Sequence, residues 1–420
     1  MIQTIELQPG VTLRCFQDNR FKQGALSIQF LRPLCKEEAA LNALIPAVLL
    51  RGTRQYPDLR KITLHLDDLY GASAGALVRK VGDLQTTGLY CSFMDDKYAL
   101  DGDQILEPAI DFTRQLLLEP VLENGCFRED FLESEKYNLI QAIESQRNDK
   151  RRYAAAQLLQ LMCKDDPFST PRLGEPEQVN AITAEGAYAH YQKILSESPV
   201  HIFYVGAQDP QVLSDSLRPV FAQLDRHPID LPQQTGLSSA PGGRHTERMD
   251  VAQGKLGVGY VTPITLRDED FAAMQVLNMI FGGGMTSKLF MQVREAQSLC
   301  YDIGSGYYGS KGILTVSAGI DFAMEDRVLE QIEIQLDACR KGDFTEEELV
   351  AAKQGLLTQL QSTHDSPGAI ENYYASGLLS GMTLTPAQYM ELVEQVTAPM
   401  VQKAAQSLER HTVYFLRGEQ

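Results

Sequence analysis

Residues 281–301 read Phe-Gly-Gly-Gly-Met-Thr-Ser-Lys-Leu-Phe-Met-Gln-Val-Arg-Glu-Ala-Gln-Ser-Leu-Cys-Tyr. In this stretch of the 420-residue chain, three consecutive glycines precede a segment with helix-like apolar spacing. The glycines lack the G-x-x-x-x-G-K-[ST] spacing of a phosphate-binding loop, and no predicted strand comes before them. We therefore expect them to end one helix and to allow close packing before the next.

A second stretch, residues 41–53, reads Leu-Asn-Ala-Leu-Ile-Pro-Ala-Val-Leu-Leu-Arg-Gly-Thr. It forms the second part of a helix predicted over Glu37–Leu50. Proline inside a helix lacks the donor N–H and clashes with the preceding turn, at a cost of roughly 3 kcal/mol. We therefore expect the helix to kink or break near Pro46.

Two halves of the chain have similar patterns, which indicates an internal duplication. A Pro-, Gly- and Ser-rich stretch, 226–246, is predicted to be an exposed linker between domains 1–225 and 247–420. In each half strands precede helices, which favours an α+β fold with helices packed on a largely antiparallel sheet. A long helix is expected from Lys136 to about Gln160. The corresponding strands are Ala25–Leu31 and Lys255–Val261, Leu84–Asp95 and Gly312–Asp321, and Val200–Gly206 and Thr412–Arg417.

Three stretches resemble the M16 (insulinase / mitochondrial processing peptidase-like) family of zinc peptidases, and the resemblance spans nearly the whole chain. Residues 281–301 follow the family pattern GGG..S.LF..VRE...L.Y, and residues 167–183 are similar to its P…LG…I..IT segment. Residues 41–53 resemble its first catalytic helix, which ends in Lys/Arg-Gly-Thr. The resemblance implies two similar domains, joined by the linker into a clam shape.

The zinc motif that this resemblance would supply is absent. Aligned on Arg51-Gly52-Thr53, the two histidine positions of H-x-x-E-H fall on Ala43 and Ala47, and the glutamate position falls on Pro46. Such a motif needs two imidazoles to hold the metal and a carboxylate to take a proton from its water. The third ligand position falls on Ala142, although Glu135 and Glu144 remain alternatives in this register. No two histidines are spaced i, i+4, so we expect neither a metal nor another cofactor.

Arg294 and Tyr301 stand where the resemblance places an Arg and a Tyr that hold the substrate backbone of the family's peptides. A guanidinium offers five donors to peptide carbonyls. A phenol can stabilise the oxyanion formed by attack of a metal-bound water. The alternative for residues of these types is a surface Arg at a helix end and a core Tyr at the start of a strand.

These residues together predict a non-catalytic subunit with little or no activity alone. It would pair with an H-x-x-E-H-bearing homologue, or with itself, and contribute Arg294 and Tyr301 to peptide hydrolysis. Within the family the chain looks most like bacterial proteins associated with 5-aminopentanol modification of elongation factor P. The open alternatives are a purely structural or peptide-binding scaffold without proteolysis and, more distantly, a hydrolase with a rebuilt site.

Composition limits the partners and the compartment. The net charge of −17 argues against binding to nucleic acid or to anionic lipid surfaces. The first residues, Met-Ile-Gln-Thr-Ile-Glu-Leu, do not have the basic and apolar regions of a signal peptide. Seven scattered cysteines without a C-x-x-C motif are typical of reduced thiols. We expect a cytoplasmic protein with a peptide substrate.

Overall fold

The computed structural model describes residues 2–233, 236–237 and 241–419. They form two compact units. The first unit contains the described residues of 1–143, 170–233 and 364–376. The second contains those of 144–169, 234–363 and 377–420. Within these described ranges, no helix is long and apolar enough to cross a bilayer.

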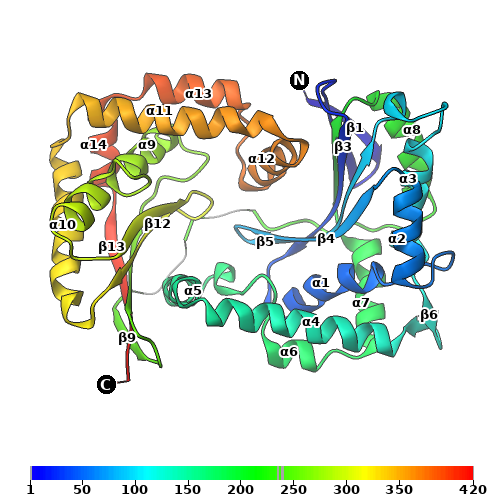
Figure 1. Cartoon of the computed structure of the whole chain (residues 1–420), viewed down its shortest axis with the longest axis horizontal. Coiled ribbons are helices and arrows are strands. Elements are labelled where there is room, and N and C mark those ends of the chain that lie inside the picture. The colour runs from blue at the N-terminus through cyan, green and yellow to red at the C-terminus, as the bar shows by residue number, and fades with distance from the viewer. Residues whose placement is uncertain (1, 234–235, 238–240, 420) are drawn as a thin grey trace. The chain divides into compact units, whose positions relative to one another are not determined.

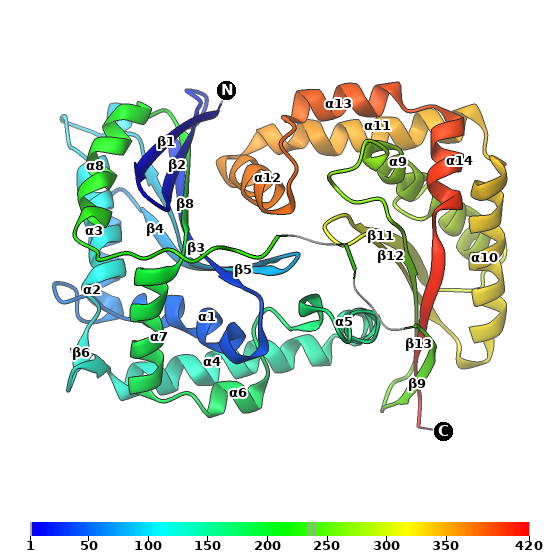
Figure 2. The same ribbon diagram turned by 180° about the vertical axis from the view of Figure 1, so that it is seen from behind.

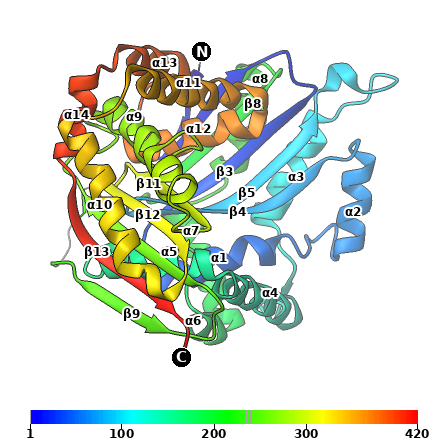
Figure 3. The same ribbon diagram turned by 60° about the vertical axis from the view of Figure 1, so that its left-hand side comes forward.

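The first unit is built on a six-stranded sheet with the order β1-β2-β8-β3-β5-β4. Strands β3, β5 and β4 lie side by side at one end of this sheet (Figure 3). All neighbours pair antiparallel except β2 and β8, which are parallel. The strands are β1 Ile2–Gln8, β2 Val11–Gln17, β3 Gln23–Pro33, β4 Ser73–Val81, β5 Leu84–Met94 and β8 Val200–Gly206.

Helices bury one face of this first sheet. Leu26 and Ile28 of β3 point to that face and belong to a core shared with the surrounding helices. The opposite face carries buried polar side chains of β3, Ser27 and Gln29. The helices that begin in this unit are α1 Lys36–Leu49, α2 Leu59–Asp68, α3 Leu106–Leu118, α4 Glu129–Asn148, α6 Pro176–Asn180, α7 Ala184–Glu197, α8 Pro210–Ala222 and α12 Pro367–Ser380, beside a short hairpin of β6 Leu122–Glu123 and β7 Cys126–Phe127.

The second unit has a five-stranded sheet with the order β11-β12-β10-β13-β9. Helix α5 packs on one face, where Gly259 leaves room for Met162, and α10 packs on the other, where Glu333 accepts a hydrogen bond from Tyr260. Figure 1 shows α5 and α10 on opposite sides of β12 and β13. The elements are β9 Arg244–Arg248, β10 Gly254–Val261, β11 Asp302–Tyr308, β12 Ile313–Ile320, β13 Glu409–Arg417, α5 Lys150–Met162, α9 Phe271–Phe281, α10 Glu325–Lys341, α11 Glu346–Ser362, α13 Pro386–Gln395 and α14 Ala398–Gln406.

The two sheets have the same connectivity, which confirms the predicted α+β fold with a largely antiparallel sheet in each half. The order β2-β8-β3-β5-β4 corresponds strand by strand to β9-β13-β10-β12-β11. In both sheets the single parallel pair joins the equivalent strands, β2 with β8 and β9 with β13. The first sheet adds only β1 at its edge.

The prediction of a single helix from Lys136 to about Gln160 is wrong. It is two helices, α4 ending at Asn148 and α5 beginning at Lys150. Asp149 between them accepts hydrogen bonds from the main-chain N–H groups of Arg151 and Arg152, so it caps the new helix. Of the predicted linker 226–246, residues 234–235 and 238–240 lie outside the described residues, and β9 begins at Arg244.

Candidate functional site

The four positions that the family resemblance assigns to the zinc motif carry alanine or proline side chains, which cannot hold a metal. Ala43 and Pro46 are buried in α1, Ala47 is partly exposed on the same helix, and Ala142 is exposed on α4. In the part of the chain that the structure describes, no three His, Cys, Asp or Glu side chains are grouped as metal ligands. The nearby alternative Glu135 accepts a hydrogen bond from Arg51 at 3.2 Å, so its carboxylate is held in an ion pair.

Helix α1 continues through Pro46 to Leu49, so the predicted break does not occur. Proline 46 leaves the carbonyl of Asn42, four residues earlier, without its helical donor. The hydroxyl of Thr87 on β5 donates to that carbonyl at 2.6 Å. A side chain of the sheet thus satisfies the acceptor that the proline leaves unpaired.

The Asn42 side chain extends this contact into a buried polar network. Its amide donates to Gln85 at 2.9 Å, and its carbonyl oxygen lies 2.8 Å from Nε2 of His190 on α7. Burial lowers the pKa of His190 to about 4, so the imidazole is neutral at pH 7. The histidine therefore has a structural role, and the network holds α1, α7 and β5 together.

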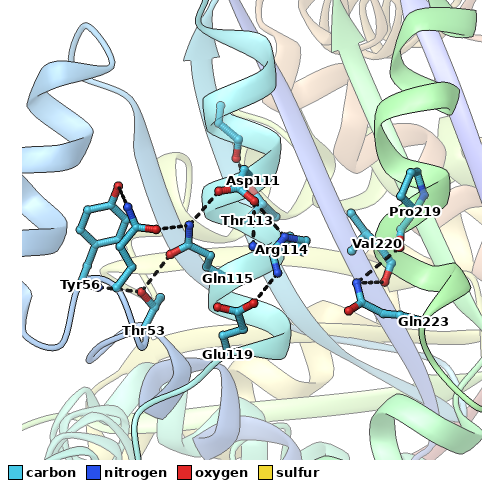
Figure 4. Close-up of polar contacts among 12 residues, drawn as sticks. Thr53, Tyr56, Asp111, Thr113, Arg114, Gln115, Glu119, Pro219, Val220 and Gln223 are labelled. Atoms are coloured by element: carbon cyan, nitrogen blue, oxygen red, sulfur yellow. Dashed lines mark hydrogen bonds and ion pairs between the residues drawn. The ribbon is translucent and has the colours of Figure 1, made fainter.

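The Arg51-Gly52-Thr53 turn after α1 is attached to helix α3 (Figure 4). Thr53 is fully buried, and its hydroxyl donates to Gln115 at 3.3 Å and accepts the N–H of Tyr56 at 3.0 Å. Gln115 in turn donates to Asp111 at 2.8 Å. These bonds hold the turn that follows α1 against α3.

Arg294 lies in a π-helical segment, Leu289–Glu295. Leu289 and Val293 anchor this segment in the core. The guanidinium lies over the ring of Phe290, 4.6 Å from its centroid, and Nε is 3.6 Å from Glu295. The side chain is 40% exposed, so its donors can reach a ligand. Single π-helical turns are frequent at functional sites.

Tyr301 immediately precedes β11 and is 59% exposed, which differs from the core tyrosine of the alternative interpretation. Its N–H donates to Gly319, and its hydroxyl donates to Asp321 at 2.9 Å. That hydrogen bond raises the pKa of Tyr301, so the phenol remains protonated at neutral pH.

Arg294 and Tyr301 lie on the two sides of the turn at Ser298, which has a left-handed φ of 52°. No hydrogen bond joins the two side chains, both of which belong to the described residues. Sequence reasoning missed their partners Phe290 and Asp321. The β11–β12 pairing that sets Asp302 opposite Gly319 brings Asp321 near Tyr301. A search of the sequence for paired strands around Tyr301 could have identified Asp321 as its partner.

Comparison with protein families and with known sequences gives one consistent result. The family model described as Peptidase M16 inactive domain matches residues 181–356. A Bacillus subtilis (strain 168) protein named "Probable inactive metalloprotease YmfF" is 31% identical over 409 residues, which cover 97% of this chain and 96% of the relative. An "Uncharacterized zinc protease" of Rickettsia felis is 23% identical over 291 residues, which cover 67% of this chain and 68% of the relative.

Solved structures show the same fold over the full chain. A conserved protein from Enterococcus faecalis V583 matches with a TM-score of 0.91 and 31% identity, covering 100% of this chain and 99% of that chain. The peptidase M16 inactive domain from Pseudomonas fluorescens matches with a TM-score of 0.81 and 18% identity, covering 100% of this chain and 98% of that chain. The names of the Bacillus subtilis relative and of the Pseudomonas fluorescens structure agree with the prediction that the chain has little or no activity alone.

Proposed function

Because the chain belongs to the M16 peptidase family and its zinc-motif positions hold Ala43, Pro46, Ala47 and Ala142, we propose that it is a non-catalytic subunit of a peptidase complex. Its partner is an M16 homologue that keeps H-x-x-E-H and binds the zinc. This chain contributes Arg294 and Tyr301 to the peptide substrate. The observation that carries the proposal is the loss of one set of functional groups alongside the retention of the other.

The surroundings of Arg294 and Tyr301 support a role in peptide binding. Both side chains are partly exposed, and neither is neutralised in a buried ion pair. A guanidinium stacked on Phe290 keeps its in-plane donors available for carbonyl oxygens. A protonated phenol oriented by Asp321 has little freedom to lose when it contacts substrate.

Strand β11 supplies a second reason to expect an extended peptide here. It is the terminal strand of its sheet among the described residues and begins one residue after Tyr301. An edge strand can bind a peptide as an additional strand through main-chain hydrogen bonds. Gly304 and Gly306 place no side chains in the middle of one face of this strand, and a Cβ at either position would meet only ordinary van der Waals contacts. The space beside these two glycines is therefore not filled by the protein's own side chains.

The test is co-expression with an H-x-x-E-H-bearing M16 homologue from the same organism, followed by cleavage of a peptide library. We expect the pair, but neither chain alone, to cleave peptides. Arg294→Ala and Tyr301→Phe should each lower kcat/KM at least tenfold without loss of the complex. Arg327→Ala, which removes an exposed arginine of α10, is the matched control.

Cleavage that is unaffected by either substitution would refute the assigned roles of Arg294 and Tyr301. A stable complex without cleavage of any peptide would favour the scaffold function, including a part in elongation factor P modification. The seven cysteines, none of which forms a disulfide within the described residues, favour the cytoplasm, a reducing compartment, as the place where the complex works.

A further inference from the structure

A pocket of about 300 Å³ lies between α5 and the outer strands of the second sheet. Helix α5, which Figure 2 shows beside this sheet, packs mainly on β10 and β13. Its Leu158 covers Gly257 of β10, which lies opposite Ser317 of β12. The side chains of Thr315 and Ser317 are partly exposed, whereas the rest of β12 is buried. The helix therefore leaves the outer part of this face open, and both hydroxyl residues line the pocket.

Glycines form the part of the pocket that lies on strand β11. The register sets Gly304 opposite Ser317 and Gly306 opposite Thr315, so the four residues share one face of the sheet. Glycine within a strand often marks a position that a ligand or another backbone approaches closely. A Cβ at Gly306 would have only the Thr315 hydroxyl nearby, at 4.0 Å. A peptide paired with the edge of β11 can therefore direct side chains over both glycines into the pocket.

Two cations line the pocket, and none of its described lining residues is Asp or Glu. Arg151 is exposed on α5, and its guanidinium makes no hydrogen bond or ion pair with another described residue. Lys255 of β10 is half-buried, and its ammonium donates to Gln253. The Asp302 carboxylate lies on the same side of Gly319 as this ammonium, but the two form no ion pair and Asp302 does not line the pocket. Even with Asp302 counted against Lys255, the charge of Arg151 remains uncompensated.

The duplicated sheet of the first unit offers an internal comparison. Strands β3 and β4 correspond to β10 and β11, and α12 comes from the other half of the sequence, as α5 does in the second unit. Glu371 of α12 places a carboxylate against the first sheet. It accepts hydrogen bonds from Ser27, Gln29 and Arg79 at 2.6, 2.8 and 2.9 Å, respectively. Helix α5 contains no Asp or Glu, so it supplies no such carboxylate to the cations and hydroxyls of the second sheet.

We propose that this pocket binds a glutamate side chain of an extended peptide, so that the substrates are acidic peptides. The proposal rests on the proposed function, because the peptide is the one expected to pair with β11. The guanidinium of Arg151 offers paired donors that match the two oxygens of a carboxylate. The hydroxyl of Ser317, which has no hydrogen-bond partner within the described ranges, can donate a further bond. Ala154 and Ala155 of α5 provide an apolar wall for the methylene groups of the glutamate, which inorganic phosphate lacks.

The experiment measures binding of four probes to the purified full chain by calorimetry. The probes are the acetylated and amidated peptide Val-Thr-Glu-Thr-Val, the same peptide with glutamine or with lysine in place of the glutamate, and inorganic phosphate. We expect the glutamate peptide to bind about tenfold more tightly than the glutamine peptide, the effect of one hydrogen bond to a charged group. The lysine peptide should bind more weakly than either, and phosphate should not bind saturably.

Two variants test the pocket itself, with thermal unfolding to show that each is folded. Arg151→Gln should abolish the preference for glutamate without weakening binding of the glutamine peptide. Gly306→Val, which puts a branched side chain on the pocket floor, should abolish the same preference, and valine is favoured in strands. Arg152→Gln is the matched control and should keep the preference. It changes the next residue of α5, which pairs with Asp149 at the surface and does not line the pocket.

Four results would overturn the proposal: no binding of any peptide, equal binding of the glutamate and glutamine peptides, saturable binding of phosphate only, or an unchanged preference in Arg151→Gln. Cleavage by the co-expressed pair separates this proposal from the proposed function. Equal kcat/KM for the two peptides in an active pair would refute the acidic specificity and leave the peptidase proposal standing. Selective binding of the glutamate peptide, together with no cleavage by any pair, would support the pocket and count against the peptidase proposal.

Discussion

The hydrogen bond from Thr87 to the Asn42 carbonyl explains how a helix tolerates Pro46 at the position that the family resemblance assigns to the catalytic glutamate. A zinc peptidase needs a carboxylate there, whereas this chain has a residue that removes a main-chain donor. The helix persists because the sheet supplies the missing donor through a buried hydroxyl. Pro46 thus supplies no carboxylate for catalysis, yet it does not break the helix.

We predict that Thr87→Val lowers the free energy of unfolding by about 1–2 kcal/mol, because a buried carbonyl loses its donor. In a Pro46→Ala background the loss should be smaller by about 1 kcal/mol, because the alanine N–H can bond to Asn42. Urea denaturation of the four proteins in this double-mutant cycle measures the coupling.

Thr63→Val, which removes an exposed hydroxyl that also donates to a helix carbonyl, is the control and should have little effect. Equal losses for Thr87→Val with and without Pro46 would show that the hydroxyl does not compensate for the proline.

At the scale of elements, α5 is held on the second sheet by close approach and by one buried ion pair. Gly259 admits Met162, because a Cβ at this position would overlap the Met162 sulfur. Beyond the helix, Asp166 is bound by Lys311 of the β11–β12 turn, with Nζ 3.0 Å from Oδ1, and both side chains are at most 1% exposed. The pair joins the end of α5 to the hairpin that begins after Tyr301.

We predict that Lys311→Met lowers the free energy of unfolding by about 3–5 kcal/mol, because it leaves the Asp166 carboxylate buried without its cation. The double variant Lys311→Met/Asp166→Leu should recover most of that loss, since no buried charge remains. Guanidinium denaturation followed by circular dichroism is the measurement.

Lys403→Met is the control. It breaks the ion pair with Asp270, in which the lysine is 70% exposed, and should leave the unfolding midpoint nearly unchanged. If the double variant were as unstable as Lys311→Met, packing and not the uncompensated charge would be the cause.

At the scale of the whole molecule, each compact unit is completed by a segment from the other half of the sequence. Residues 144–169 belong to the second unit, and residues 364–376 belong to the first. The second of these segments carries Glu371, whose carboxylate accepts hydrogen bonds from Ser27, Gln29 and Arg79. These two segments, and not the linker alone, therefore connect the two halves of the sequence.

We predict that fragments 1–233 and 234–420 do not fold cooperatively when expressed separately and form a soluble complex when co-expressed. Fragment 1–233 lacks Glu371, so Arg79 loses its carboxylate partner. Co-purification and thermal unfolding measure the effect. Glu371→Gln in the second fragment should weaken the complex, whereas Glu391→Gln, at an exposed position, should not. A cooperative transition of fragment 1–233 alone, at the midpoint of the intact chain, would contradict this prediction.

The sequence by itself determined the α+β class, the repeat and the absence of the zinc motif, because these depend on local periodicity and on residue identity. The predicted strand Val200–Gly206 has the same bounds as β8. Sequence also selected Arg294 and Tyr301, whose roles remain predictions.

Only the tertiary structure decided the rest, because it depends on contacts between residues distant in the sequence. Thr87 lies 45 residues from Asn42, and Glu371 lies 344 residues from Ser27. Local patterns specify which elements form, whereas the pairing of buried polar groups requires the folded arrangement that brings them together.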